Sequence, residues 1–346
     1  MCTSPLKGFL NGLTENGKKN LIVAPYAVDH INFINGHKKY VYDSTNYSSE
    51  CLTEFVEIPC GQCIECRLQR SRRWADRCML EMQYHEHSWF ITLTYDNSHL
   101  PLNEVIDDET GEICYNATLN KKHFQDFMKR LRRAYEYQGH ENKLRYFMAG
   151  EYGSQTLRPH FHAIIFGLEL PSEDLHLFKR NIQGDCIYTS DFIQKLWPYG
   201  FSTVGAVTWQ SCAYVARYIM KKHLGKDSDF YENYNIEPEF TLMSRKPGIA
   251  RQYYDEHKDE LFSYDFVSVP THQGAVKVYP PPYFEKLFEE DFPEQDVLER
   301  KEKRKQAKID SVNFQLEKTD KKYLDYLKTK EYNIENRLKS LVRNDL

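Results

Sequence analysis

The sequence lacks a long apolar run: no stretch of about 18 consecutive apolar residues occurs in its 346 residues. No membrane-spanning helix and no membrane partner are therefore expected. The first residues also lack the apolar segment of a secretory signal peptide. Without an export signal, the nine cysteines are expected to be reduced thiols in a cytosol.

Two further absences limit the function. The formal net charge of -4 lacks the basic excess of proteins that coat nucleic acid, although an enzyme acting at a single DNA site needs only a local basic face. No Gly-x-x-x-x-Gly-Lys-Ser/Thr pattern occurs, so an ATP-binding loop of that kind is not expected.

The order of predicted elements indicates the fold class. Strands are predicted at 89–95, 144–152, 160–167 and 201–209, and helices at 64–86, 121–137, 172–182, 190–197 and 211–223. The segment 96–118 is predicted to be an inserted loop or hairpin because it contains a turn pattern. This order predicts an α+β fold, with an antiparallel sheet covered by helices on one face.

Composition divides the chain into four regions. Residues 1–58 are expected to form short strands and loops, and 59–223 the main α+β core. Residues 224–284 are expected to be an irregular annex. Residues 285–346 are charged and predicted to be helical, and their basic run is expected to be a solvated face.

A candidate metal site lies in the two strands at 144–152 and 160–167. His160 and His162 are two residues apart, so a strand would place both imidazoles on one face. In a symmetric hairpin, Glu151 lies opposite His160 and shares that face. A carboxylate with two imidazoles suits Mg²⁺ or Mn²⁺ on a phosphate. A lone His-x-His pair is more often structural, and a one-residue slip would turn Glu151 away.

The helix predicted at 211–223 carries two tyrosines four residues apart, Tyr214 and Tyr218. A helix places them on one face, about 6 Å apart along its axis. A tyrosine hydroxyl can attack a phosphodiester as a covalent nucleophile. Lys221 and Lys222 follow one turn later and are candidate phosphate contacts. Taken alone, two tyrosines on an amphipathic helix are more often packing residues.

Several segments together carry a family resemblance. They are Cys60-Gly-Gln-Cys-Ile-Glu-Cys66, Phe90-Ile-Thr-Leu-Thr-Tyr95, Gly150-Glu-Tyr-Gly153, Arg158-Pro-His-Phe-His162 and Tyr214-Val-Ala-Arg-Tyr-Ile-Met-Lys-Lys222. In this order they resemble the HUH endonuclease superfamily of rolling-circle initiators, whose core is related to the RRM-like fold. More specifically, they resemble the replication initiators of gokushoviruses, small phages with single-stranded DNA. The resemblance covers about residues 58–223.

This resemblance implies a reaction. Members of the superfamily nick the origin of the double-stranded replicative form through a 5′-phosphotyrosine and later join strands into circles. His160 and His162 match the family's metal pair, and Tyr214 and Tyr218 match its paired nucleophiles. Arg158 and Arg217 lie in the same motifs and are candidate DNA contacts. The implied partners are origin DNA, a host helicase and a host DNA polymerase, in the host bacterial cytoplasm.

A cysteine trio and two basic clusters complete the candidates. Cys60, Cys63 and Cys66 could hold a structural Zn²⁺, with Cys51 or Cys78 as a fourth ligand, or be plain reduced thiols. The arginines of 67–77 and the basic run 129–133 are candidate phosphate contacts.

Three alternatives stay open on the sequence alone. One has the same chemistry in a plasmid relaxase or a single-strand transposase. Another is a DNA-binding protein without catalysis, and the third is a zinc-stabilised interaction module.

Overall fold

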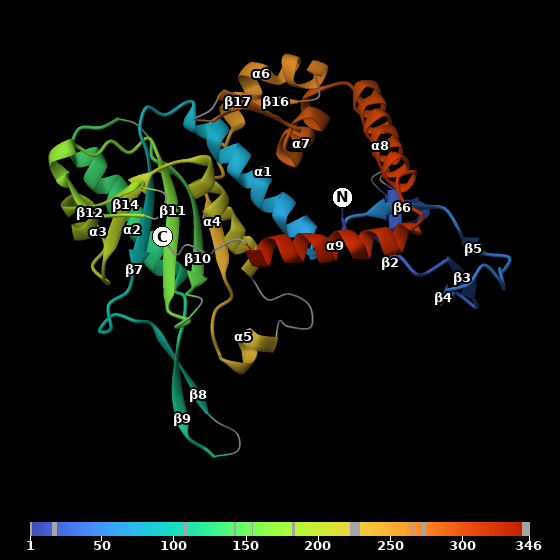
Figure 1. Cartoon of the computed structure of the whole chain (residues 1–346), viewed down its shortest axis with the longest axis horizontal. Helices are drawn as coiled ribbons and strands as arrows, with labels where there is room; N and C mark the ends of the chain where they lie inside the picture. Colours follow the sequence, from blue (N-terminus) through green and yellow to red (C-terminus); the bar gives the residue numbers. More distant parts are fainter. Residues whose placement is uncertain are drawn as a thin grey trace. The chain divides into compact units, whose positions relative to one another are not determined.

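The computed structural model describes residues 2–15, 19–106, 110–141, 143–153, 155–181, 184–221, 229–264, 266–271 and 274–340. The chain forms two compact units (Figure 1). Unit 1 contains residues 1–69 and 302–343, and unit 2 contains residues 70–301. The chain passes from one unit to the other within two helices, α1 (Ile64–Met82) and α8 (Glu294–Leu316).

Unit 2 is built on a seven-stranded sheet with the order β12-β13-β14-β7-β11-β10-β15. Every neighbouring pair in this sheet is antiparallel. Its strands are β7 (Ser88–Thr94), β10 (Arg145–Tyr152), β11 (Pro159–Phe166), β12 (Leu175–Arg180), β13 (Cys186–Ser190), β14 (Ser202–Ala206) and β15 (Phe240–Met243). The predicted α+β class with an antiparallel sheet is thus confirmed.

The centre of this sheet has a recognisable topology. The chain runs β7, α2 (Lys121–Tyr137), β10, β11, α3 (Asp191–Leu196) and β14, which is the β-α-β-β-α-β order of ferredoxin-like and RRM-like folds. The matching spatial order is β14-β7-β11-β10. Hydrophobic spacing produces α2, since Phe124, Phe127 and Leu131 are fully buried on one side of it.

Helices cover both faces of the sheet, so the expectation that one face is covered was wrong. Because side chains alternate along a strand, Ile164 of β11 faces one way and Ile165 the other. Ile164 belongs to a core cluster with α1 and α4 (Trp209–Lys221), whereas Ile165 packs in a second cluster with α2 and α3. The sequence order could not reveal the second layer, because α1 precedes the first core strand.

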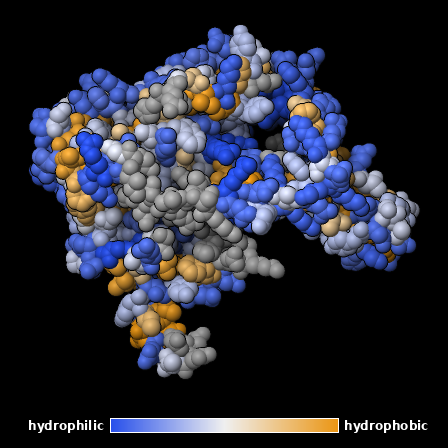
Figure 2. Space-filling model, viewed as in Figure 1, coloured by the Kyte–Doolittle hydropathy of each residue, from blue (hydrophilic) through white to orange (hydrophobic). Residues whose placement is uncertain are grey.

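Two other parts of unit 2 test the element predictions. The segment 96–118 contains a hairpin of β8 (Leu102–Ile106) and β9 (Ile113–Ala117), as expected. Its exposed apolar side chains, Leu102, Ile106, Ile113 and Tyr115, form part of the orange surface of Figure 2. The helix predicted at 172–182 was wrong, because a single 3₁₀ turn leads there into β12, which pairs with β13.

The described part of 224–284 is more regular than expected. It contains α5 (Asp229–Asn233), β15 at the edge of the main sheet, α6 (Arg251–Tyr264) and the hairpin β16 (Val267–Thr271) with β17 (Gly274–Val278). Helix α7 (Pro282–Asp291) follows. Tyr254 of α6 and Phe284 of α7 are fully buried in the core cluster of α1 and α4.

Unit 1 joins both ends of the chain. Its strands are β1 (Leu6–Leu13), β2 (Lys19–Pro25), β3 (His30–Ile34), β4 (His37–Val41), β5 (Cys51–Leu52) and β6 (Phe55–Ile58). They form two three-stranded sheets, β2-β1-β6 and β4-β3-β5. Helix α8 and helix α9 (Tyr323–Ser340) supply contacts to these strands, because Lys308 and Tyr323 both bind the Glu57 carboxylate, at 2.9 and 2.8 Å.

The search for membrane-spanning segments gave a simple result. Among the described residues, no helix is both long enough and apolar enough to cross a bilayer.

Candidate functional site

The pairing of β10 with β11 positions the three predicted metal ligands. Glu151 lies directly opposite His160, and Ala149 lies opposite His162, which is the register expected from a symmetric hairpin. Opposed residues share a face of the sheet, and so do residues two apart on one strand. Glu151, His160 and His162 therefore point to the same side, the side covered by α4.

The three side chains meet at one carboxylate oxygen. Oε1 of Glu151 lies 2.6 Å from Nε2 of His160 and 3.0 Å from Nε2 of His162. One ligand atom from each residue lies within 4.8 Å of the others, so the group could hold a metal ion. The two imidazole rings stand perpendicular to each other, at 89°, and this brings both Nε2 atoms toward the carboxylate.

The other nitrogen of each ring is engaged elsewhere. Nδ1 of His160 lies 3.1 Å from the carbonyl oxygen of Arg158, and Nδ1 of His162 lies 2.9 Å from Oγ1 of Thr92. Partners of this kind fix the orientation of a ligating histidine and leave its second nitrogen for the metal. When Nδ1–H of His160 donates to Arg158, the Nε2 lone pair faces Glu151, where a proton or a cation can bridge them.

The site is buried and negatively charged at its centre. The side chains of Glu151 and His162 are 1% and 3% exposed, while that of His160 is 19% exposed, so His160 lies at the solvent side. Burial raises the pKa of Glu151, but hydrogen bonds to the two imidazoles outweigh it and lower the pKa to about 2. A buried carboxylate that stays ionised favours a cation beside it.

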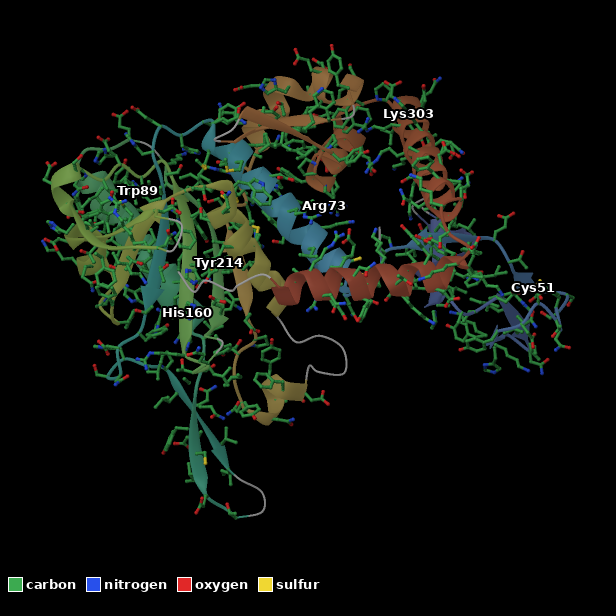
Figure 3. The ribbon with its side chains drawn as sticks, in the orientation of Figure 1. Cys51, Arg73, Trp89, His160, Tyr214 and Lys303 are labelled. Carbon is green, nitrogen blue, oxygen red and sulfur yellow. The ribbon has the colours of Figure 1, made fainter. Side chains whose placement is uncertain are left out.

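Helix α4 brings Tyr214 to the same face. The Tyr214 ring lies edge-on to the His162 ring at 5.1 Å and to the Phe90 ring at 6.2 Å. Figure 3 labels His160 on β11 and Tyr214 on α4. The helix starts with a reciprocal cap: Ser211 N–H donates to Thr208 Oγ1 at 3.1 Å, and Thr208 N–H donates to Ser211 Oγ at 2.8 Å.

The second tyrosine lies one turn further along α4. The backbone of Tyr218, Arg217 and Lys221 is helical, which keeps Tyr218 four residues after Tyr214 as predicted. The side chains of these three residues lie outside the described part of the structure. Lys222 lies entirely outside the described residues.

Comparisons with known proteins agree with this arrangement. A family model described as a "Replication-associated protein" of the ORF2 type matches residues 88–223. The "Replication-associated protein ORF2" of Spiroplasma virus 4 is 32% identical over 288 residues, which cover 83% of this chain and 85% of that protein.

This chain belongs to the replication-associated protein family. A second relative is the "Replication-associated protein VP4" of Bdellovibrio phage phiMH2K, 32% identical over 80% of this chain and 82% of its own length. The "Replication-associated protein A" of Enterobacteria phage phiX174 is 28% identical over 51% of this chain and 33% of that protein. No solved structure matches.

Family membership implies a role in the replication of a phage genome. The match at 88–223 includes Glu151, His160, His162 and both tyrosines. Within this replication-associated protein, the Cys trio at 60–66 precedes the matched segment.

The structure gives some predicted DNA contacts other tasks. Nη2 of Arg158 donates to the carbonyl oxygen of Tyr95 at 2.8 Å, which ties the β10–β11 turn to the end of β7. Arg77 lies between the rings of Trp74 and Tyr283 and donates to the Ile249 carbonyl. Its guanidinium is therefore part of the core, and predicting it as a phosphate contact was wrong.

The run 129–133 is also partly structural. Arg130 donates to the carbonyl of Leu196, and Arg132 donates to that of Leu144. Arg72 and Arg73 of α1, by contrast, are exposed. Figure 3 labels Arg73 on this helix. These two side chains are the better phosphate candidates of the two clusters.

The cysteine trio has a fourth member that the sequence prediction missed. Cys2 joins Cys60, Cys63 and Cys66, and all four Sγ atoms lie within 4.8 Å of one another. Cys51 and Cys78, the two expected alternatives, are not in this group. Cys2 lies 58 residues before Cys60. Spacing along the chain could not reveal it, because the two segments meet only in the fold.

Proposed function

We propose that this protein is a metal-dependent endonuclease and strand-transferase that initiates rolling-circle replication of a phage genome. It would nick the origin in double-stranded replicative-form DNA and later join strands into circles. The supporting observation is the convergence of Glu151, His160 and His162, with the ring of Tyr214 against His162. A candidate cation site and a candidate nucleophile thus share one face of the sheet.

The proposed nicking step is an exchange of phosphodiester bonds. The hydroxyl oxygen of Tyr214 or Tyr218 attacks phosphorus and loses its proton, and a new bond forms between the tyrosine oxygen and the phosphate. The bond from phosphorus to the 3′ oxygen breaks, and that oxygen takes up a proton. The products are a 5′-phosphotyrosine and a 3′-hydroxyl that can prime synthesis.

The ligand set fits a hard divalent cation, Mg²⁺ or Mn²⁺. One carboxylate and two imidazoles leave further positions for water and phosphate oxygens. An ion held there would polarise a phosphate oxygen and offset the charge that develops on it. Glu151 contributes the permanent negative charge, while His160 and His162 contribute neutral Nε2 atoms oriented by their Nδ1 partners.

Two tyrosines explain how strands would be joined without an external energy source. The first tyrosine stays bound to the 5′ end while the other attacks the regenerated origin. A free 3′-hydroxyl then attacks the phosphotyrosine, which restores a phosphodiester and releases the tyrosine. The spacing of Tyr214 and Tyr218, one helical turn on α4, suits this alternation.

Several partners follow from this proposal. Arg158, Arg217, Lys221 and Lys222 are proposed to hold the phosphates of origin DNA, and such contacts would position the DNA rather than select its sequence. A host helicase would unwind the duplex, and a host DNA polymerase would extend the 3′-hydroxyl. The proposed place of action is the host bacterial cytoplasm.

A denaturing gel tests the covalent step directly. Purified protein is mixed with labelled single-stranded DNA of its own genome, with Mn²⁺ or with a chelator. We expect a metal-dependent protein–DNA band that is weaker in Tyr214→Phe and in Tyr218→Phe and absent in the double variant. Tyr137→Phe, which alters an exposed tyrosine of α2, should leave the band unchanged.

The histidine pair is tested in the same assay. His160→Ala and His162→Ala should abolish the band at every Mn²⁺ concentration, whereas His176→Ala, at an exposed position of β12, should not. DNA binding without any covalent band would instead favour a non-catalytic DNA-binding protein. Family membership favours phage replication over a plasmid relaxase or a single-strand transposase, which share the chemistry.

A further inference from the structure

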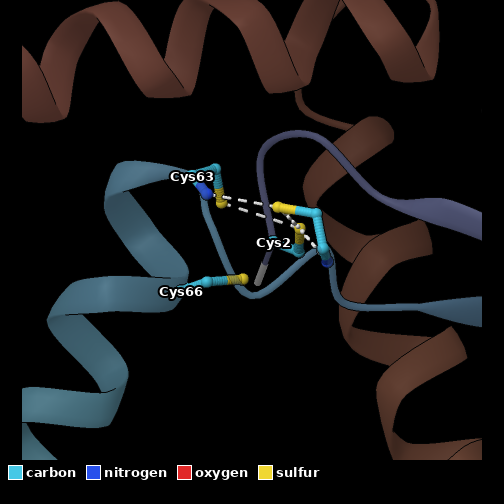
Figure 4. Close-up of side chains that lie close together, drawn as sticks. Cys2, Cys63 and Cys66 are labelled. Carbon is cyan, nitrogen blue, oxygen red and sulfur yellow. Dashed lines mark hydrogen bonds between the residues drawn. The ribbon is translucent and has the colours of Figure 1, made fainter. Parts of the chain in front are cut away.

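Four cysteine thiols from three segments of unit 1 form a cluster. Cys2 precedes β1, Cys60 and Cys63 lie between β6 and the start of α1, and Cys66 lies in the first turn of α1. Figure 4 shows the side chains of Cys2, Cys63 and Cys66 directed toward one point. Cys2 is buried, and the other three are half-buried.

The distances fit a tetrahedral metal site. Sγ of Cys2 lies 3.5 Å from Sγ of Cys60 and 3.6 Å from Sγ of Cys63. In a disulfide the two sulfur atoms would be about 2.05 Å apart. Four thiolates around Zn²⁺, each with a Zn–S bond of about 2.3 Å, lie about 3.8 Å from one another. The observed separations are close to the second value.

Backbone N–H groups surround the sulfur atoms. The N–H groups of Gln62 and Cys63 donate to Sγ of Cys60 at 3.4 and 3.2 Å, and N–H of Cys60 donates to Sγ of Cys2 at 3.3 Å. Such donors stabilise the negative charge of thiolates and orient them as ligands. Gly61 makes the tight turn possible, because its φ of +74° is unfavourable for other residues.

We propose that Cys2, Cys60, Cys63 and Cys66 bind one Zn²⁺ ion with a structural role. Four thiolates fill a tetrahedral coordination sphere, so no position remains for substrate or water. Soft sulfur ligands also separate this site from the Glu151 group, whose oxygen and nitrogen ligands suit harder cations. The site goes beyond the proposed DNA chemistry and does not depend on it.

Unit 1 has a physical need for such a cross-link. Its core cluster of buried residues is small: Phe9, Ile22, Ala24, Val28 and Ile31. Small hydrophobic cores often need a metal or disulfides for stability. The proposed Zn²⁺ would tie the segment before β1 to the start of α1. Thr3, next to Cys2, also donates to Glu331 of α9 at 2.8 Å, so the same segment contacts the C-terminal helix.

Metal analysis and cobalt spectroscopy test the site. Protein from zinc-supplied cells, dialysed in reductant, should carry about one Zn²⁺ per chain. The His162→Ala variant should carry the same amount, since its change lies in the other ligand group. Co²⁺ exchanged into the protein should give the thiolate-to-metal charge-transfer absorption and the intense visible bands of a tetrahedral sulfur site.

Matched cysteine variants locate the ligands. Cys2→Ser and Cys63→Ser should lose the zinc and the cobalt bands, whereas Cys51→Ser, a half-buried position outside the cluster, should keep both. Retention of zinc in Cys2→Ser, or equal loss in Cys51→Ser, would overturn the proposal.

Alkylation of the parent protein avoids any folding defect of the variants. With zinc bound, Cys2, Cys60, Cys63 and Cys66 should be protected from a thiol reagent. They should become labelled together when a strong chelator is added. Labelling that ignores the chelator, or a mass lower by two hydrogen atoms from a disulfide among the four, would contradict the zinc site.

Discussion

At the scale of single residues, His162 links the sheet to α4. Its ring stacks on Phe90 at 5.4 Å, meets the ring of Tyr214 at 5.1 Å and hydrogen-bonds to Thr92. A ring held on three sides has little freedom to turn. The Nε2 direction is therefore set before any ion or DNA binds, and that is how a preorganised ligand saves entropy.

Thr92→Val tests this orientation. Valine has the same shape but no hydroxyl, so Nδ1 of His162 loses its partner and the ring is less well oriented. We expect Mn²⁺ to bind about 10–100-fold more weakly. The affinity is measured by calorimetry on the dialysed protein. The control is Thr94→Val on the same strand, whose hydroxyl donates to the Phe201 carbonyl and touches neither histidine. Equal losses in both variants would refute the role given to Thr92.

Residue-scale prediction from the sequence was good where neighbours are close in the chain. Glu151 and His160 are separated by a short turn, so hairpin symmetry determines which residues face each other. Prediction failed for Cys2 and for Arg77. Their partners, Cys60 and Tyr283, lie far away along the chain, and no local periodicity records such contacts.

At the scale of elements, the position of both tyrosines depends on where α4 begins. Thr208 and Ser211 cap its first turn reciprocally, which satisfies two N–H groups that have no partner within the helix.

Removing the cap should weaken α4. Thr208→Ala is expected to destabilise unit 2 by about 1 kcal/mol, because the Ser211 N–H loses its acceptor. Chemical denaturation measures this change, with Thr156→Ala at an exposed turn position as the control. The covalent band of the gel assay should also form more slowly in Thr208→Ala. Unchanged stability would show that tertiary packing alone determines the start of α4.

Element prediction succeeded where hydrophobic spacing was unambiguous, as in α2 with its buried Phe124, Phe127 and Leu131. It failed at 172–182, where apolar residues such as Leu175 and Phe178 are three apart and also fit a helix. Pairing with β13 makes this segment a strand. The same limit applies to β15, which is four residues long and depends on its pairing with β10.

At the scale of the whole molecule, one buried carboxylate connects several elements of unit 2. Glu81 of α1 pairs with Arg145 of β10 and accepts hydrogen bonds from His85 Nε2 at 3.1 Å and from the N–H of Ala250 at 2.6 Å. Ala250 directly precedes α6, so Glu81 joins α1, the sheet and α6. Burial raises the pKa of Glu81, but the bonds to His85 and Ala250 and the charge of Arg145 outweigh it and lower the pKa.

Glu81→Gln should destabilise unit 2 by about 3–5 kcal/mol, because it leaves the half-buried charge of Arg145 without its partner. The pH dependence has a definite sign. A carboxylate whose folded pKa lies below its ordinary value of about 4.5 stabilises the fold fully above that pH and loses its effect as the pH falls further. The thermal stability of parent and variant should therefore differ most near neutrality and converge below about pH 4.5. Glu86→Gln, at a side chain that is 89% exposed, should follow the parent at every pH. A difference between parent and Glu81→Gln that stayed constant down to acid pH would mean that the lost shape of the contact, rather than its charge, accounts for the destabilisation.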